Sequence, residues 1–159
     1  MAKTRLYLAY GSNLSQEQMA HRCPAASVVG TAILRNWQLQ FKTHATVTPA
    51  KGYNVPVLVW SLTPACEAAL DMYEGYRPNH ERMGYYHKQY VRIRVGDAKS
   101  YRKAMLYVMN PRPLQLPQRG YYNIIHDAYE ELGFDMGILD TAIAECRRGV
   151  PARVVEETH

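Results

Sequence analysis

The order of strand-like and helix-like segments is the feature that most constrains how this chain folds. Strand patterns dominate the first two thirds, at 5–10, 28–47, 55–62, 90–95 and 104–109, and the clearest helical patterns come late, at 121–132 and 136–148. A parallel doubly wound sheet would need strands and helices in regular alternation along the chain. The order therefore predicts an α+β fold, and 159 residues are enough for one domain.

Capping signals predict where several of these elements begin and end. Asn13 is a candidate N-cap, with Gln16 completing a pattern like a capping box. Thr63 and Pro64 predict the start of another helix, because Thr caps well and Pro is tolerated at the first helical position. The last helix is expected to end at Gly149. We therefore expect a single domain at 1–149 and a mobile tail at 150–159.

Composition narrows the class of protein. The start of the chain has no apolar run behind its basic residues, and the longest apolar stretches are too short to span a bilayer. Three widely separated cysteines, Cys23, Cys66 and Cys146, favour neither a disulfide framework nor a zinc site. The six histidines show no metal-ligand spacing either. These features predict a cytoplasmic protein with free thiols, no membrane association and no metal.

The formal charge of +5 is concentrated between Arg77 and Lys103. A solvated strand face is the simplest explanation of such a run. Steering of an anionic small substrate comes second. Nucleic-acid binding ranks lowest: tyrosines are interleaved with the basic residues, but no known nucleic-acid motif accompanies them.

The segment from Tyr10 to Leu14, with the sequence Tyr-Gly-Ser-Asn-Leu, has the pattern of a strand that turns into a helix N-terminus. Backbone N–H groups converge in such a turn and can hold a carboxylate or stabilise an oxyanion. An ordinary strand-to-helix turn is the alternative, because Gly-Ser-Asn is also common turn chemistry.

Glu74 is predicted at the C-terminal end of a helix, where the helix dipole disfavours negative charge. We expect the pKa of its carboxyl group to be raised, and more so if the following loop buries it. A carboxyl group in such a place is a candidate for proton transfer, whereas an exposed glutamate with a small stability cost is the alternative.

Two segments together resemble the γ-glutamylcyclotransferase-like family: Tyr7 to Leu14, which contains Tyr-Gly-Ser-Asn-Leu, and Leu70 to Tyr76, which contains Glu74-Gly75. The similarity extends over roughly residues 6–143 and includes Tyr121, four residues after Pro117. The resemblance implies a small closed mixed β-barrel surrounded by helices. One departure is the segment Tyr76 to Tyr85, which is longer than expected for compact members of the family.

The family resemblance also implies an activity: cyclisation of a γ-glutamyl amide to 5-oxoproline with release of an amine or amino acid. It implies Glu74 as the catalytic acid–base and Tyr121 as a substrate-binding residue, beside Tyr10, Gly11, Ser12, Asn13 and Leu14. The nucleophile is the substrate's own amino group, so neither a cofactor nor a metal is expected.

Several alternatives stay open. The leaving group could belong to a γ-glutamyl amino acid, a γ-glutamylamine or glutathione, and the protein could be a monomer or a homodimer. The fold could also serve as a non-catalytic module that binds a small molecule or nucleic acid, although we expect no specific nucleic-acid partner.

Overall fold

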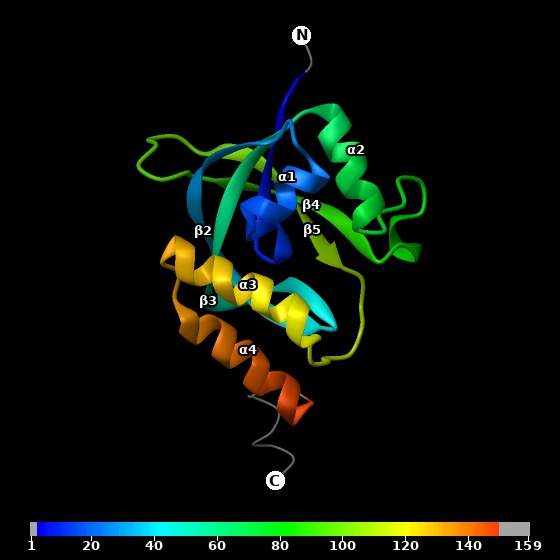
Figure 1. The fold of residues 1–159 in the computed structure, drawn as a ribbon, viewed down its shortest axis with the longest axis vertical. Coiled ribbons are helices and arrows are strands. Elements are labelled where there is room, and N and C mark those ends of the chain that lie inside the picture. Colours follow the sequence, from blue (N-terminus) through cyan, green and yellow to red (C-terminus); the bar gives the residue numbers. More distant parts are fainter. Residues whose placement is uncertain (1–2, 150–159) are drawn as a thin grey trace.

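The computed structural model describes residues 3–149, so the predicted tail at 150–159 lies outside the described residues. In chain order the elements are β1 (Arg5–Ala9), η1 (Ser12–Leu14), α1 (Gln16–Arg22), β2 (Ser27–Lys42), β3 (His44–Leu62), α2 (Pro64–Tyr73), η2 (Glu81–Met83), β4 (Tyr86–Ile93), β5 (Arg102–Met109), α3 (Arg119–Leu132) and α4 (Met136–Arg148). The strands precede the two long C-terminal helices, as predicted, and the fold is α+β (Figure 1).

The five strands form one mixed sheet in the order β2-β3-β1-β5-β4. β1 lies in the middle, antiparallel to β3 and parallel to β5. β2 and β3 form a long antiparallel hairpin with two register shifts, between Val28 and Gly30 and between Arg35 and Trp37. Such bulges bend and twist a strand, which curls this side of the sheet.

The prediction of a closed barrel is wrong, because the edge strands β2 and β4 do not form a ladder. Gly96 donates one backbone hydrogen bond of 2.9 Å to Thr31, near the turn that follows β4. Beside this contact, residues of both edge strands, such as Leu34 of β2 and Ile93 of β4, line a cavity of about 380 Å³. Closure would require continuous pairing with a fixed stagger between all neighbouring strands. The sheet therefore curls without closing.

The two C-terminal helices pack together in the lower half of Figure 1, where α4 also contacts β2. Ile125 and Tyr129 of α3 and Leu139 and Ala142 of α4 are buried, as the predicted helical periodicity requires. Both helices end at glycines in the left-handed conformation, Gly133 and Gly149. These boundaries agree with the predictions from the sequence.

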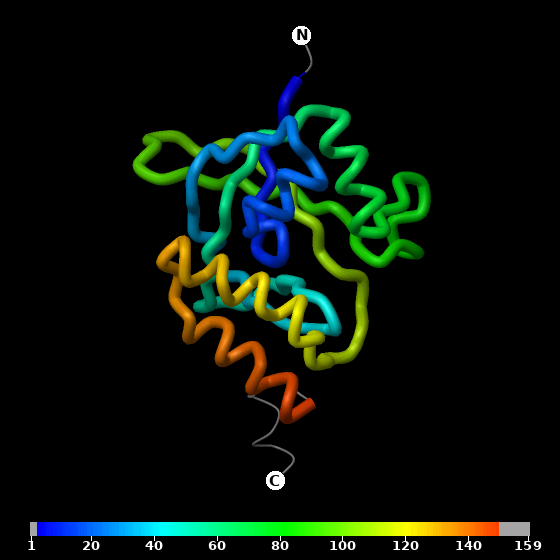
Figure 2. Tube along the Cα trace, viewed as in Figure 1, coloured from blue at the N-terminus to red at the C-terminus, as the bar shows by residue number. Residues whose placement is uncertain are grey.

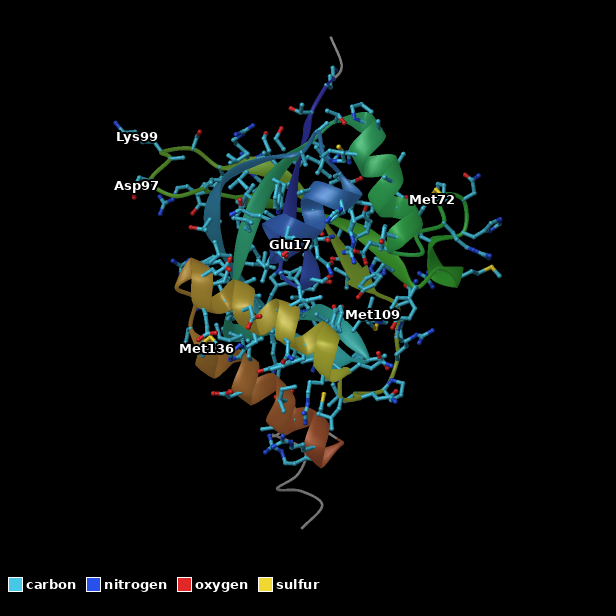
Figure 3. All side chains as sticks on the ribbon, viewed as in Figure 1. Glu17, Met72, Asp97, Lys99, Met109 and Met136 are labelled. Atoms are coloured by element: carbon cyan, nitrogen blue, oxygen red, sulfur yellow. The ribbon has the colours of Figure 1, made fainter. Side chains whose placement is uncertain are left out.

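The alternation expected at 90–95 is also present in the structure. Ile93 is buried, Val91 is half-buried, and the side chains of Arg92 and Arg94 are exposed. The β4–β5 turn projects from the body of the protein, with Asp97 and Lys99 near its tip (Figure 3). None of the helices within residues 3–149 combines the length and the apolar character needed to span a bilayer.

Candidate functional site

Helix α2 delivers Glu74 to the wall of a cavity. The helix begins as predicted: the Thr63 hydroxyl accepts a hydrogen bond of 3.2 Å from the N–H of Cys66, and Pro64 follows in the first turn. Glu74 is the C-terminal cap, and its N–H donates to Leu70. Gly75 then turns the chain with φ of 63°, a conformation that favours glycine. The chain therefore leaves the helix with the Glu74 side chain facing the cavity.

The cavity has a volume of about 460 Å³ and is dominated by tyrosines. Its lining residues are Tyr7, Tyr10, Gly11, Ser12, Asn13, Arg22, His44, Ala45, Met72, Tyr73, Glu74, Gly75, Tyr85, Tyr86, Tyr107 and Tyr121. Glu74 is the only carboxylate among them, and Arg22 the only arginine or lysine. A volume of this size fits a small organic substrate.

The carboxyl group of Glu74 has a strongly altered proton affinity. Burial raises its pKa from 4.5 to about 7, and the nearby guanidinium of Arg22 opposes part of that rise. Burial disfavours the ionised form because the carboxylate loses solvation by water. A carboxyl group with a pKa near 7 can both accept and return a proton at neutral pH.

The loop from Gly11 to Asn13 also lines the cavity, but it does not form the helix N-terminus that the sequence suggested. Residues 12–14 form a short 3₁₀ turn, and α1 begins only at Gln16. Ser15, not Asn13, caps α1, by accepting a hydrogen bond from the N–H of Gln18. Within residues 3–149, the N–H groups of Gly11, Ser12 and Asn13 have no hydrogen-bond acceptor. Any ligand bound by these groups would have no help from a helix dipole, because the loop does not begin α1.

The side chain of Asn13 connects this loop to Glu74. Its amide nitrogen donates to the Tyr7 hydroxyl at 2.9 Å and lies 3.5 Å from a Glu74 oxygen. Its amide oxygen accepts a hydrogen bond of 2.6 Å from Arg22. The indole of Trp60 donates to the backbone carbonyl of Asn13 at 3.1 Å. These bonds satisfy a buried amide and hold it against the carboxyl group.

Arg22 ends α1 and faces the same cavity. Its Nη1 also contacts the Ser12 hydroxyl at 3.2 Å, and its guanidinium lies over the ring of Tyr73, 4.1 Å from the centroid. A guanidinium carries five N–H donors, so the contacts with Ser12 and Asn13, both through Nη1, leave donors for a further anion.

The tyrosine hydroxyls are held in place by the backbone. Tyr121 accepts a hydrogen bond of 3.0 Å from the N–H of Ala45, and Tyr86 donates to the Ala45 carbonyl at 2.7 Å. Tyr10 donates to the Tyr107 carbonyl at 2.6 Å. Burial raises the pKa of Tyr7, Tyr10 and Tyr121 well above the ordinary value, so these phenols stay neutral.

Most of the residues proposed from the sequence meet at this cavity. Tyr10, Gly11, Ser12, Asn13 and Tyr121 line it together with Glu74. Leu14 does not reach it and packs in the hydrophobic core instead. Sequence reasoning missed Tyr7, Arg22, His44 and Tyr85, which come from four separate segments. A weak signal existed for two of them: Tyr7 begins the segment that resembles the family, and Arg22 is a basic residue in the last turn of the helix that follows the Gly-Ser-Asn loop.

Among the described residues, one group has side chains close enough together to hold a metal ion: His126, Asp127 and Glu130 on α3. Asp127 and Glu130 are exposed, and the group lies outside the wall of the cavity. Exposed acidic side chains often cluster without a metal, so this group supports no metal site at the cavity.

Comparisons with known proteins find similarity over most of the domain. A family model described as gamma-glutamyl cyclotransferase, AIG2-like, matches residues 7–129. A solved structure named gamma-glutamyl cyclotransferase superimposes with a TM-score of 0.70 at 23% identity, covering 94% of this chain and 89% of the other. An uncharacterised protein from Homo sapiens gives a TM-score of 0.71 at 22% identity with the same coverage.

YkqA from Bacillus subtilis has a TM-score of 0.69 at 15% identity, and the match covers 94% of this chain but only 56% of YkqA. No curated protein sequence matches the chain. At these identities the structural matches establish the fold alone. The family model covers most of the chain, from Tyr7 to Tyr129 within α3, and includes every residue that lines the cavity. The chain belongs to the gamma-glutamyl cyclotransferase, AIG2-like family.

Proposed function

We propose that the protein is a γ-glutamylcyclotransferase-type enzyme, which converts a γ-glutamyl amide to 5-oxoproline and releases an amine or amino acid. The observation that carries this proposal is Glu74, a carboxyl group with a pKa of about 7 in the wall of a tyrosine-lined cavity. Membership of the family and the fold shared with a protein named gamma-glutamyl cyclotransferase support it.

Glu74 transfers protons in both halves of the reaction. Its carboxylate takes a proton from the α-ammonium group of the substrate, and the resulting amine attacks the γ-carbonyl carbon. A new carbon–nitrogen bond closes the five-membered ring, and the bond to the leaving amine breaks. Glu74 then returns a proton to the leaving nitrogen, and the second proton lost by the original ammonium exchanges with solvent. A pKa near the working pH suits both directions of transfer.

Other residues of the cavity bind and orient the substrate. The free donors of Arg22 suit the α-carboxylate, next to the site where Glu74 receives the α-ammonium proton. The N–H groups of Gly11 to Asn13 suit the oxyanion that forms on the γ-carbonyl. Tyrosine hydroxyls hold the chain of the substrate curled, which brings the amine close to the carbonyl.

The proposed chemistry exchanges one amide for another, so it requires no redox group and no external nucleophile. All three cysteines are free and buried, which is compatible with the proposed location in the cytoplasm.

Detection of 5-oxoproline by mass spectrometry tests the proposal. The protein is incubated with a panel of γ-glutamyl amino acids, γ-glutamylamines and glutathione, beside two variants, Glu74→Gln and Glu17→Gln. Glu17 is exposed on α1 and serves as the matched control. We expect 5-oxoproline from the native protein and from Glu17→Gln only. Binding of the panel without any product would favour the alternative of a non-catalytic module.

A further inference from the structure

Arg112 lies next to the cavity, outside its wall, and packs on the ring of Tyr85. Its guanidinium carbon lies 4.2 Å from the ring centroid of Tyr85, and Tyr85 lines the cavity. A guanidinium group is attracted to an aromatic face when it lies within about 6 Å of the ring centroid, so this contact is a cation–π interaction. The side chain of Arg112 is exposed, and within residues 3–149 it forms no ion pair with a carboxylate.

Local and long-range interactions restrain the backbone of the segment that carries Arg112. Pro111 and Pro113 flank the arginine and restrict the backbone. On one side, the Asn110 N–H donates to the Tyr85 carbonyl at 3.0 Å. On the other, Gln115 exchanges backbone hydrogen bonds with the β2–β3 turn, to Phe41 and from Thr43. Figure 2 shows this segment running past that turn on its way to α3.

The charge of Arg112 acts on His44 and Tyr85, two residues that line this side of the cavity. His44 contacts the Tyr85 hydroxyl through Nδ1 at 2.8 Å and packs edge-on against Tyr121. Burial, with a smaller effect of the Arg112 charge, lowers the pKa of His44. The imidazole is therefore neutral at pH 7, and Arg112 supplies the positive charge here.

The two arginines act on different parts of the site. Arg22 lies over Tyr73 and its charge acts on Glu74, whereas Arg112 lies over Tyr85 and its charge acts on His44 and Tyr85. The glutamyl part of a substrate has one carboxylate and one ammonium group, which Arg22 and Glu74 match. The glutamyl part therefore leaves the charge of Arg112 uncompensated.

We propose that Arg112, held on Tyr85, is a specificity-determining residue that selects leaving amines with an anionic group. This inference rests on the proposed function. It assigns as substrates the γ-glutamyl conjugates of amines that carry a carboxylate or a sulfonate, in preference to conjugates of neutral or cationic amines. The anion of the leaving group lies beside the guanidinium and receives charge-assisted hydrogen bonds from it.

Four γ-glutamyl amides with the same two-carbon spacer test this selection. The leaving amines are β-alanine, taurine, propylamine and ethylenediamine, which end in a carboxylate, a sulfonate, a methyl group and an ammonium group. The measurement is kcat/KM for 5-oxoproline formation. We expect the two anionic amides to exceed the propylamide by about tenfold, with the ammonium compound lowest. The preference should decrease at 0.5 M salt, because this arginine is exposed.

Variants assign the preference to Arg112. In Arg112→Gln, the ratio of anionic to neutral substrate should fall close to one, mainly through a higher KM for the anionic amides. Arg112→Lys keeps the charge and should retain part of the preference. Arg147→Gln is the matched control, because Arg147 is exposed on α4 and lines a different cavity. It should behave like the native protein.

The outcomes separate this inference from the proposed function. Turnover of all four amides at similar kcat/KM, or a preference that survives Arg112→Gln, would overturn the role of Arg112 and leave the proposed function intact. Absence of 5-oxoproline from every amide would overturn the proposed function and, with it, this inference.

Discussion

Replacement of Glu74 by glutamine separates the chemical role of this side chain from its role in the fold. Glutamine keeps the size and the hydrogen-bonding capacity of glutamate, but it cannot take up and return a proton. General acid–base catalysis contributes about 10²- to 10⁴-fold, so kcat for 5-oxoproline formation should fall by at least about 100-fold. Substrate binding should change less, because Arg22 and the N–H groups of Gly11 to Asn13 are unaltered.

The same substitution should stabilise the folded protein at alkaline pH. The pKa of Glu74 is raised in the folded state from 4.5 to about 7, so the folded state binds the proton more tightly than the unfolded state. Stability therefore decreases as pH rises from about 4.5 to about 7, where the native protein must ionise a buried group. At 1.36 kcal/mol for each pKa unit, the full difference corresponds to about 3 kcal/mol. The remaining solvent exposure of Glu74 makes this an upper limit.

Urea denaturation of native protein and variant at pH 5, 7 and 8.5 measures this effect. We expect the variant to gain stability over the native protein as pH rises, and to differ little at pH 5. Glu131→Gln, an exposed glutamate on α3, should show no such trend. A Glu74→Gln variant that forms 5-oxoproline at a near-native rate would refute the proposed mechanism. An unchanged stability difference from pH 5 to 8.5 would refute the raised pKa.

Three further expectations follow from the site and its surroundings. Arg22→Gln removes the cation that lowers the pKa of Glu74, so the acidic limb of the pH profile of kcat/KM should move above pH 7 and KM should rise. Thr63→Ala removes the cap of α2 and should cost about 1 kcal/mol in urea denaturation, while kcat at 15 °C stays near the native value. Fluorescence anisotropy should detect no specific nucleic-acid binding at physiological salt, and any weak binding between 50 and 200 mM salt should fall steeply; retention of a defined RNA or DNA would contradict this expectation.

The sequence predicts elements well wherever their boundaries depend on neighbouring residues. Thr63 and Pro64 start α2, and Gly133 and Gly149 end α3 and α4, because caps and left-handed turns are local interactions. Asn13 shows the limit of this reasoning. Its side chain forms bonds with Tyr7 and Arg22 in place of a helix cap, and Ser15 caps α1. Tertiary contacts outweighed the local preference.

Contacts between segments far apart in the chain are harder to predict from the sequence. The stagger between β2 and β4 decides whether the sheet closes, and no pattern within either strand encodes it. Arg112 illustrates the same limit at the site. In the sequence it is one more basic residue after β5, and only the fold brings it to Tyr85 and the cavity. The family resemblance identified Glu74 and the Gly-Ser-Asn loop, but not the residues that surround them.

Burial contributes more to the raised pKa of Glu74 than the helix dipole on which the prediction from the sequence was based. The end of a helix contributes about 0.3–1 kcal/mol at an exposed position, less than a rise from 4.5 to about 7 requires. Burial is the largest cause, and the helix end matters chiefly because it fixes where the carboxyl group lies. Met72 and Tyr73, the two residues before it, remain largely exposed, and Met72 points away from α2 in Figure 3. All three residues line the cavity, but the carboxyl group of Glu74 is the one that lies within 3.5 Å of Asn13 and is largely buried. The end of α2 thus determines where the carboxyl group of Glu74 lies, and burial in the cavity raises the pKa of that group.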